Sequence, residues 1–214
     1  MADRLDVAFA TLDSLPATLG REDAPLIVMP FIDAVAAHRA AQLMARRAAV
    51  AGDLICIHDV HRVGFIAVAN TAFRRSVAPQ FGYVAQDAFA GRRWLALALD
   101  ELNEKNGGLL AFNDGKWGGM LAAFGLASRA WALGNYDGDL FCSDYVRHYA
   151  DVELTLIAMQ QRKFRFEPLA VLVEADWDKD VHQVDARDRL LYYQRSQSAF
   201  EGKVTNASLR RLFK

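Results

Sequence analysis

The chain has 214 residues, of which 53% are hydrophobic and 24% charged, and its formal net charge is -1. This length fits one α/β domain with a small appendage, and the near-neutral charge argues against a general nucleic-acid-binding protein, which normally has a basic excess. Cys56 and Cys142 lie far apart and indicate neither a disulfide framework nor a metal motif, so a cytoplasmic location is expected. The sequence shows no signal peptide and no apolar run near the roughly 18 residues that a membrane-spanning helix needs.

The regular pattern begins after an N-terminal extension. Residues 1–24 alternate weakly and predict a short strand or helix followed by a loop. Leu26–Met29 is a continuous apolar run, which is typical of a strand covered on both faces, and Pro30 ends it. Asp33 then caps a helix predicted over 34–50, in which apolar residues recur at helical spacing.

Strand-like runs and helical patterns alternate through the next part of the chain. The predicted strands are 54–57, 83–85 and 109–112; residues 64–70 lead into a helix over 71–76, and a further helix covers 94–102. Each strand run finishes in polar or turn residues. The alternation predicts a mostly parallel sheet flanked by helices, with one functional edge where the strands end.

The pattern changes after Gly119. Residues 120–132 are apolar with many small side chains, and a helix is predicted from Asp151 to Arg162. Two short strands, 164–166 and 171–173, are predicted on either side of a proline, and the charged tail from 185 to 214 has a helical pattern. We therefore divide the chain into an N-terminal extension (1–24), an α/β domain (25–180) and a C-terminal helical tail packed on that domain (181–214).

Three carboxylates occupy positions suited to chemistry. Asp87 lies where the third predicted strand ends, and a carboxylate there can hold a divalent cation against a phosphate. Capping of the following helix is the alternative role for Asp87. Asp59 follows the second strand and Asp151 opens a helix. If the three converge, one can bind a metal, one can recognise a base or ribose, and one can act as general base on a hydroxyl.

Five segments, taken in chain order, resemble the inverting family-2 glycosyltransferases with the GT-A fold. They are Leu26–Asp33, Leu54–Asp59, Gly64–Asn70, Tyr83–Asp87 and Ala150–Leu154, and the resemblance spans about residues 25–175. It implies a GT-A-like (Rossmann-like) α/β fold and a hexosyltransferase-type enzyme. Such an enzyme moves a sugar, with inversion, from a UDP-, GDP- or dTDP-linked donor to a hydroxyl of a glycan or lipid-linked acceptor. The product would belong to a surface polysaccharide or similar glycan.

The resemblance also implies roles for individual residues. Asp151 matches the catalytic base, and Glu153 completes its motif on the acceptor side. Asp87 matches the ligand of Mn2+ or Mg2+, and Glu174 stands where many members carry a metal-site histidine. The positions that match the donor nucleotide site are Pro30, Phe31, Asp33, Asp59 and Asn70.

Two residues of the turn after the fourth strand are candidates for the acceptor site on their own chemistry. Trp117 offers an aromatic face on which a sugar can stack, with a place in the core as the alternative. Asp114 is either a pocket residue or an ordinary turn residue. The tail from Arg187 to Lys214 is expected to pack on the domain, with peripheral contact at the inner face of a membrane or a homo-oligomer contact as alternatives.

The sequence also departs from the family pattern. Gln86 replaces an acidic residue beside Asp87, so metal dependence is expected to be weaker, and Ala150 replaces the first member of the acidic pair. These departures keep open a nucleotide-binding or scaffold protein with little or no catalysis. A sugar nucleotidyltransferase is the third alternative, although residues 30–33 lack the Gly-rich basic loop expected of one.

Overall fold

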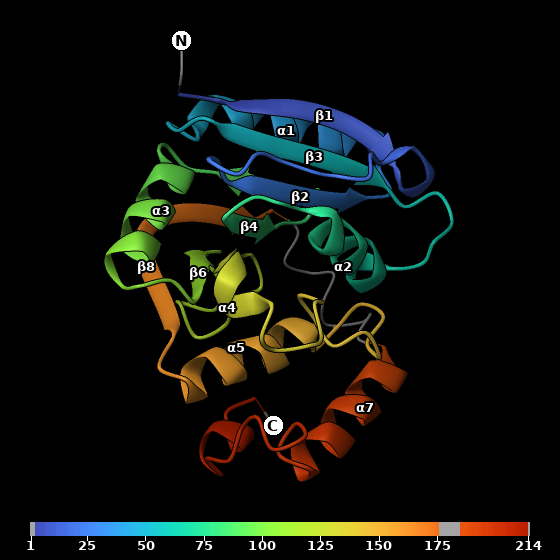
Figure 1. Ribbon diagram of the computed structural model, residues 1–214, viewed down its shortest axis with the longest axis vertical. Helices are drawn as coiled ribbons and strands as arrows, with labels where there is room; N and C mark the ends of the chain where they lie inside the picture. Colours follow the sequence, from blue (N-terminus) through green and yellow to red (C-terminus); the bar gives the residue numbers. More distant parts are fainter. Residues whose placement is uncertain (1–2, 176–184, 214) are drawn as a thin grey trace.

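The computed structural model describes residues 3–175 and 185–213 and shows a mixed α/β fold built on one curled sheet (Figure 1). Among the described residues, the sheet has eight strands in the order β1-β3-β2-β4-β7-β6-β8-β5. The strands are β1 Leu5–Thr11, β2 Leu26–Phe31, β3 Gly52–His58, β4 Gln80–Tyr83, β5 Ala88–Ala90, β6 Leu109–Asn113, β7 Gly125–Ser128 and β8 Phe164–Glu174. The helices are α1 Ala34–Arg47, α2 Phe65–Arg75, α3 Trp94–Glu104, α4 Arg129–Ala132, α5 Ala150–Gln160 and α7 Ala186–Gln197, with 3-10 turns η1 Leu12–Ser14 and η3 Leu209–Arg211.

Most of the strands run in one direction. The pairs β1–β3, β3–β2, β2–β4 and β6–β8 are parallel, whereas β7 is antiparallel to both of its neighbours and β5 is antiparallel to β8. The predicted α/β class with a mostly parallel sheet is confirmed, and the antiparallel pairs are the difference from it. Because β2, β3, β4, β6 and β8 point the same way, their carboxyl ends meet at one edge of the sheet.

Two hydrophobic layers cover the faces of the sheet. Helices α1 and α3 pack on one face, and α2 and α5 pack on the other, with α7 on the far side of α5 (Figure 1). Strand β2 explains the continuous apolar run of the sequence. Ile27 and Met29 belong to the first layer, Leu26 and Val28 belong to the second, and all four side chains are buried.

Local signals near the N-terminus are mostly confirmed. Residues 5–11 form the edge strand β1. The carboxylate of Asp33 accepts hydrogen bonds from the amides of Val35 and Ala36 at 2.8 and 3.1 Å, so it caps α1 as expected. The helix ends at Arg47 rather than near residue 50, because Ala49 has a left-handed backbone (φ 58°). Helix α2 begins at Phe65, earlier than the predicted 71–76.

In the middle of the chain, the structure excludes one alternative and contains elements that were not predicted. Asp87 does not cap a helix, because strand β5 follows it and α3 begins only at Trp94, after Arg93 with a left-handed backbone. The apolar stretch 120–132 contains strand β7 and the short helix α4. Its small residues gave no strand signal.

The C-terminal part differs from expectation at two points: the helix of the tail ends at Gln197, and the region around Pro168 is one strand. The two strands predicted around Pro168 form the single strand β8, and the pairing of β8 with β6 shifts register between Ala111 and Asn113 to accommodate the proline region. Helix α7 begins after Asp185, whose side chain accepts from the amides of Arg187 and Asp188. The predicted boundary between residues 180 and 181 lies outside the described residues. Within the described ranges, no helix has the length and apolarity needed to cross a membrane.

Candidate functional site

A cleft of about 870 Å³ opens at the edge of the sheet where the parallel strands end. Seven of the residues singled out from the sequence line it: Pro30, Phe31, Asp59, Asp87, Trp117, Asp151 and Glu174. They come from the ends of β2, β3, β4, β6 and β8 and from the first turn of α5. The other four, Asp33, Asn70, Asp114 and Glu153, are not among the lining residues.

Asp59 is fixed at the wall of the cleft by the loop that follows β3. One carboxylate oxygen accepts from the amide of Val63 and the other from the amide of Gly64, both at 2.9 Å. The side chain is largely buried, and the Asp59 amide donates to the Phe31 carbonyl at 2.9 Å. Gly64 has φ 98°, a backbone conformation that favours glycine. Since each carboxylate oxygen has a second lone pair, Asp59 retains acceptor capacity for a ligand.

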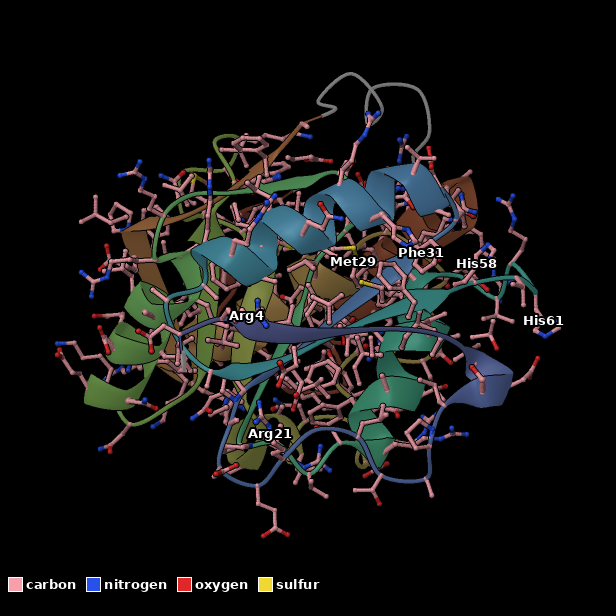
Figure 2. All side chains as sticks on the ribbon, turned by 90° about the horizontal axis from the view of Figure 1, so that it is seen from above. Arg4, Arg21, Met29, Phe31, His58 and His61 are labelled. Atoms are coloured by element: carbon pink, nitrogen blue, oxygen red, sulfur yellow. The ribbon has the colours of Figure 1, made fainter. Side chains whose placement is uncertain are left out.

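An aromatic pair supports the floor of the same region. The Phe31 and His58 rings stack with centroids 4.9 Å apart and planes 8° from parallel, and Figure 2 shows them side by side at the end of the strands. His61 lies at the tip of the following loop, away from this pair (Figure 2), and its Nε2 is 2.8 Å from Asp13. The hydrogen bond and charge of Asp13 raise the pKa of His61. The stacked pair holds Phe31 in place beside Asp59.

Gln86 ties two loops of the cleft together. Its side-chain carbonyl accepts hydrogen bonds from the amides of Ile32 and Asp33 at 2.8 and 2.9 Å. The loop after β2 is therefore joined to the segment that carries Asp87. The sequence had indicated Gln86 only as a missing acid, whereas the structure gives its side chain a defined bonding role.

Asp87 immediately precedes β5, and Glu174 ends the neighbouring strand β8. Ala88 pairs with Glu174 across β5 and β8, and the Asp87 carbonyl accepts from the amide of Ala175 at 3.1 Å. Both side chains line the cleft. Lys116, from the turn after β6, places its Nζ 3.9 Å from Glu174 Oε2. A cation and two carboxylates thus meet at one end of the cleft.

These two carboxylates fit a hard divalent cation in one particular mode. Mg2+ is commonly bound by one or two carboxylates together with substrate phosphates and water, rather than by a cage made only of protein ligands. In the described part of the chain, no group of three or more His, Cys, Asp or Glu side chains is arranged to hold a metal ion. The carboxylates of Asp87 and Glu174 are of the kind that binds such an ion together with a phosphate group.

Asp151 lines the cleft from the first turn of α5. The positive end of the helix dipole stabilises a carboxylate at this position. Burial, and secondarily the charge of Asp151, raise the pKa of Tyr83, whose hydroxyl donates to the Ala122 carbonyl at 2.7 Å. Asp151 is thus a carboxylate presented to the cleft near a neutral, fixed tyrosine.

Three of the candidates outside the cleft hold backbone segments. Asp33 caps α1. Asn70 is buried and exchanges two hydrogen bonds of 2.9 Å with the backbone of Phe141. The buried Asp114 accepts from the amides of Lys116 and Trp117, both at 2.9 Å, and so shapes the turn that carries Trp117.

The fourth, Glu153, is fully buried beneath the cleft. Its carboxylate accepts from the hydroxyls of Tyr136 and Tyr145 at 2.8 and 2.9 Å and forms a two-point pair with Arg195, both contacts 2.8 Å long. The hydrogen bond with Glu153 is the main cause that raises the pKa of Arg195. Glu153 joins α5 to α7.

Two residues of the C-terminal segment also line the cleft. Leu212 and Phe213 reach its wall, and the rings of Phe213 and Trp117 lie edge to face with centroids 6.2 Å apart. Met120 completes this apolar end of the cleft. The sequence contains no spacing or motif that connects residues 212 and 213 with Trp117, so this wall could not be found from it.

Comparison with known proteins leaves the family open: no protein-family model matches the chain, and no curated protein sequence matches it.

Proposed function

We propose that this protein is an inverting glycosyltransferase with a GT-A-like fold, acting on a nucleoside-diphosphate sugar. The observation that carries the proposal is the meeting of Asp59, Asp87 and Asp151 in one cleft. These residues come from three separate parts of the chain and lie beyond the carboxyl ends of parallel strands, where open α/β sheets bind nucleotides.

The donor would occupy the half of the cleft formed by the ends of β2, β3 and β4. Asp59 is available to accept a hydrogen bond from the base, with Pro30 and Phe31 beside it. Asp87 and Glu174 would hold Mn2+ or Mg2+ on the diphosphate. When bound, such an ion would stabilise the charge that develops on the departing nucleoside diphosphate. Lys116 adds a positive charge at the same end.

The chemical step requires one proton acceptor and a displacement. Asp151 takes the proton of the acceptor hydroxyl as that oxygen bonds to the anomeric carbon. The bond between this carbon and the diphosphate oxygen breaks with its electron pair going to the diphosphate. The configuration inverts because the acceptor oxygen attacks from the face opposite the diphosphate in a single displacement. The proton remains on the Asp151 carboxyl group until it passes to solvent.

The apolar end of the cleft supports an acceptor with an apolar face or chain. Trp117 can stack on a sugar ring, and Met120 and Leu212 remain 47% and 42% exposed beside it. This lining suits a glycan or lipid-linked acceptor. A cytoplasmic location, with peripheral contact at the inner membrane face for a lipid-linked acceptor, belongs to the same proposal.

Calorimetric titration tests the donor assignment. The purified protein is titrated with UDP, GDP and dTDP, each with and without Mn2+. We expect one of them to bind with metal dependence and binding to be lost in Asp87→Ala, while Asp100→Ala, a change on the exposed surface of α3, leaves it intact. If none binds in either condition, the proposal is wrong for these nucleotides.

Donor turnover distinguishes an enzyme from a nucleotide-binding protein without catalysis. The non-catalytic protein remains an alternative because only two carboxylates of the described residues stand at the proposed metal position. Release of nucleoside diphosphate from the matching sugar donor should disappear in Asp151→Asn, and binding of the nucleoside diphosphate should persist. Binding without turnover in the unaltered protein would instead favour the non-catalytic alternative.

A further inference from the structure

One face of α7 holds the segment that forms the catalytic side of the cleft. Three side chains of this face, spaced four and three residues apart, point to the same side of the helix. They are Asp188, Tyr192 and Arg195, and the backbone amide of the N-cap residue Asp185 adds a fourth contact. All four residues make contacts with the stretch from Val146 to Glu153, which contains Asp151.

Asp188 binds three successive amides of this stretch. Its side chain is fully buried, and its carboxylate accepts hydrogen bonds from the successive amides of Val146, Arg147 and His148 at 3.1, 2.8 and 2.9 Å. Hydrogen bonds to an ionised acceptor are about twice as strong as neutral ones. A buried carboxylate without such partners would be very unfavourable. The charge of Asp188 is therefore committed to holding this piece of backbone.

The other three contacts extend the same attachment along the chain. The Asp185 amide donates to His148 Nδ1 at 3.3 Å. The Tyr192 ring stacks on Tyr149 with centroids 4.8 Å apart. Arg195 pairs with Glu153. Helix α7 thus contacts residues on both sides of Asp151 in the sequence.

The held segment belongs to the cleft itself. Arg147, His148 and Tyr149 line it together with Asp151. The Val146 carbonyl accepts from the amide of Ile66 at 3.4 Å, which joins the segment to the start of α2, directly after the loop that carries Asp59. A shift of residues 146–149 would therefore move the start of α5 relative to the donor half of the cleft.

We infer that Asp188 is a positioning residue, which fixes segment 146–149 and through it the location of Asp151. This inference rests on the proposed glycosyltransferase function. It assigns helix α7, which contributes none of the lining residues, to the catalytic architecture. Efficient displacement needs the general base held within hydrogen-bonding distance of the acceptor hydroxyl, and a misplacement of about 1 Å can cost about 100-fold in rate.

The test uses Asp188→Asn in the full chain, with Asp100→Asn as the matched control. The asparagine amide group can turn only one oxygen toward the three amide donors and places an NH2 group against the others. We expect faster hydrogen exchange at the amides of Val146, Arg147 and His148. Turnover of the donor should fall about 10- to 100-fold. The affinity for nucleoside diphosphate should be unchanged, because the three amides that Asp188 binds lie in the segment before α5. Asp100→Asn should match the unaltered protein in every measurement.

The possible results test separately the attachment of residues 146–148 by Asp188 and the positioning of Asp151. Unchanged exchange at residues 146–148 in a folded Asp188→Asn variant would overturn the attachment. Faster exchange with normal turnover would overturn the positioning role. If the unaltered protein turns over no donor, the proposed function and the positioning role both fail, and exchange still reports on the attachment. Should the variant not fold, exchange in the unaltered protein decides: rapid exchange at the three amides contradicts the attachment, and slow exchange supports it.

Discussion

Gln86 shows how one side chain can serve two neighbouring structures. Its carbonyl oxygen joins the loop after β2 to the segment that carries Asp87, and the same position precedes the proposed metal ligand. A glutamate has the same length and keeps a carbonyl-like acceptor for both amides. The glutamine at this position therefore differs from a glutamate in charge and not in size, since the shape of the cleft would allow an acid.

Gln86→Glu is expected to strengthen metal dependence. A second negative charge next to Asp87 attracts a divalent cation, and in a partly solvated site we expect about tenfold tighter Mn2+ binding, or about 1.4 kcal/mol. The measurement is the Mn2+ concentration that half-saturates nucleoside diphosphate binding. Gln42→Glu, on the exposed surface of α1, should leave this concentration unchanged. Equal Mn2+ dependence in both variants would argue against a metal beside residue 87.

The presence of an aspartate in the sequence does not show whether its side chain binds backbone amides or faces a ligand site. Asp33, Asp114 and Asp188 all accept from backbone amides, and Asp59 does so while it also faces the cleft. The sequence correctly indicated the strand ends where carboxylates gather, because apolar runs followed by polar residues mark them. It could not separate a cap from a ligand, since both need the same short carboxylate after a strand or before a helix.

At the scale of elements, the loop between β3 and α2 contacts the segment that precedes α5. Gly64 combines φ 98° with a close approach, since a Cβ added there would lie 2.7 Å from the Val146 carbonyl oxygen. Its amide also donates to Asp59. A single glycine thus allows the donor side and the catalytic side of the cleft to touch.

Gly64→Ala should be destabilising for both backbone and packing reasons, and Gly138→Ala separates the two. Gly138 has a similar φ of 94°, but a Cβ there would meet no atom within 4 Å. Both variants introduce backbone strain, and only Gly64→Ala adds overpacking, so we expect it to lose about 1–3 kcal/mol more. Urea unfolding measures the difference. Equal losses would mean that the contact with Val146 has no energetic weight.

The elements that the sequence missed share a physical cause. Strand β7 contains Gly125 and Ala127, whose small side chains give little strand signal, and Gly125 is needed because a Cβ would meet the Tyr83 hydroxyl at 2.5 Å. Strand β5 has only three residues. Pro168 suggested a break, yet β8 continues past it through a register shift. Long apolar strands and capped helices were found because their signals are local, whereas these depend on partners distant in sequence.

At the scale of the whole molecule, buried cysteine thiols and tyrosine hydroxyls that stay protonated make the stability of the fold decrease at alkaline pH. Burial raises the pKa of Cys56 from 9.0 to about 12 and that of Cys142 from 9.0 to about 11. Burial also raises the pKa of Tyr83, Tyr145 and Tyr192 from 10.0. In each case the folded state retains a proton that the unfolded chain releases once the pH exceeds 9 or 10.

The melting temperature should therefore be steady up to about pH 8.5 and should fall as the pH rises toward about 10.5. The sign follows because the unfolded state binds fewer protons than the folded state in this window, so the free energy of unfolding decreases with pH. Differential scanning calorimetry at several pH values measures it. Cys142→Ala should show a shallower fall, and a melting temperature that does not change up to about pH 10.5 would contradict the burial of these groups.

The position of β1 has a consequence for the order of folding. During synthesis β1 is made before the other strands of this sheet, but its partner is β3, with Leu5 opposite Gly52, and β2 lies on the other side of β3. Parallel pairing across nearly fifty residues cannot form as a local hairpin and must wait for the intervening helix. Strand β1 therefore stays unpaired until β2, α1 and β3 have come together, and it adds to that side of the sheet afterwards.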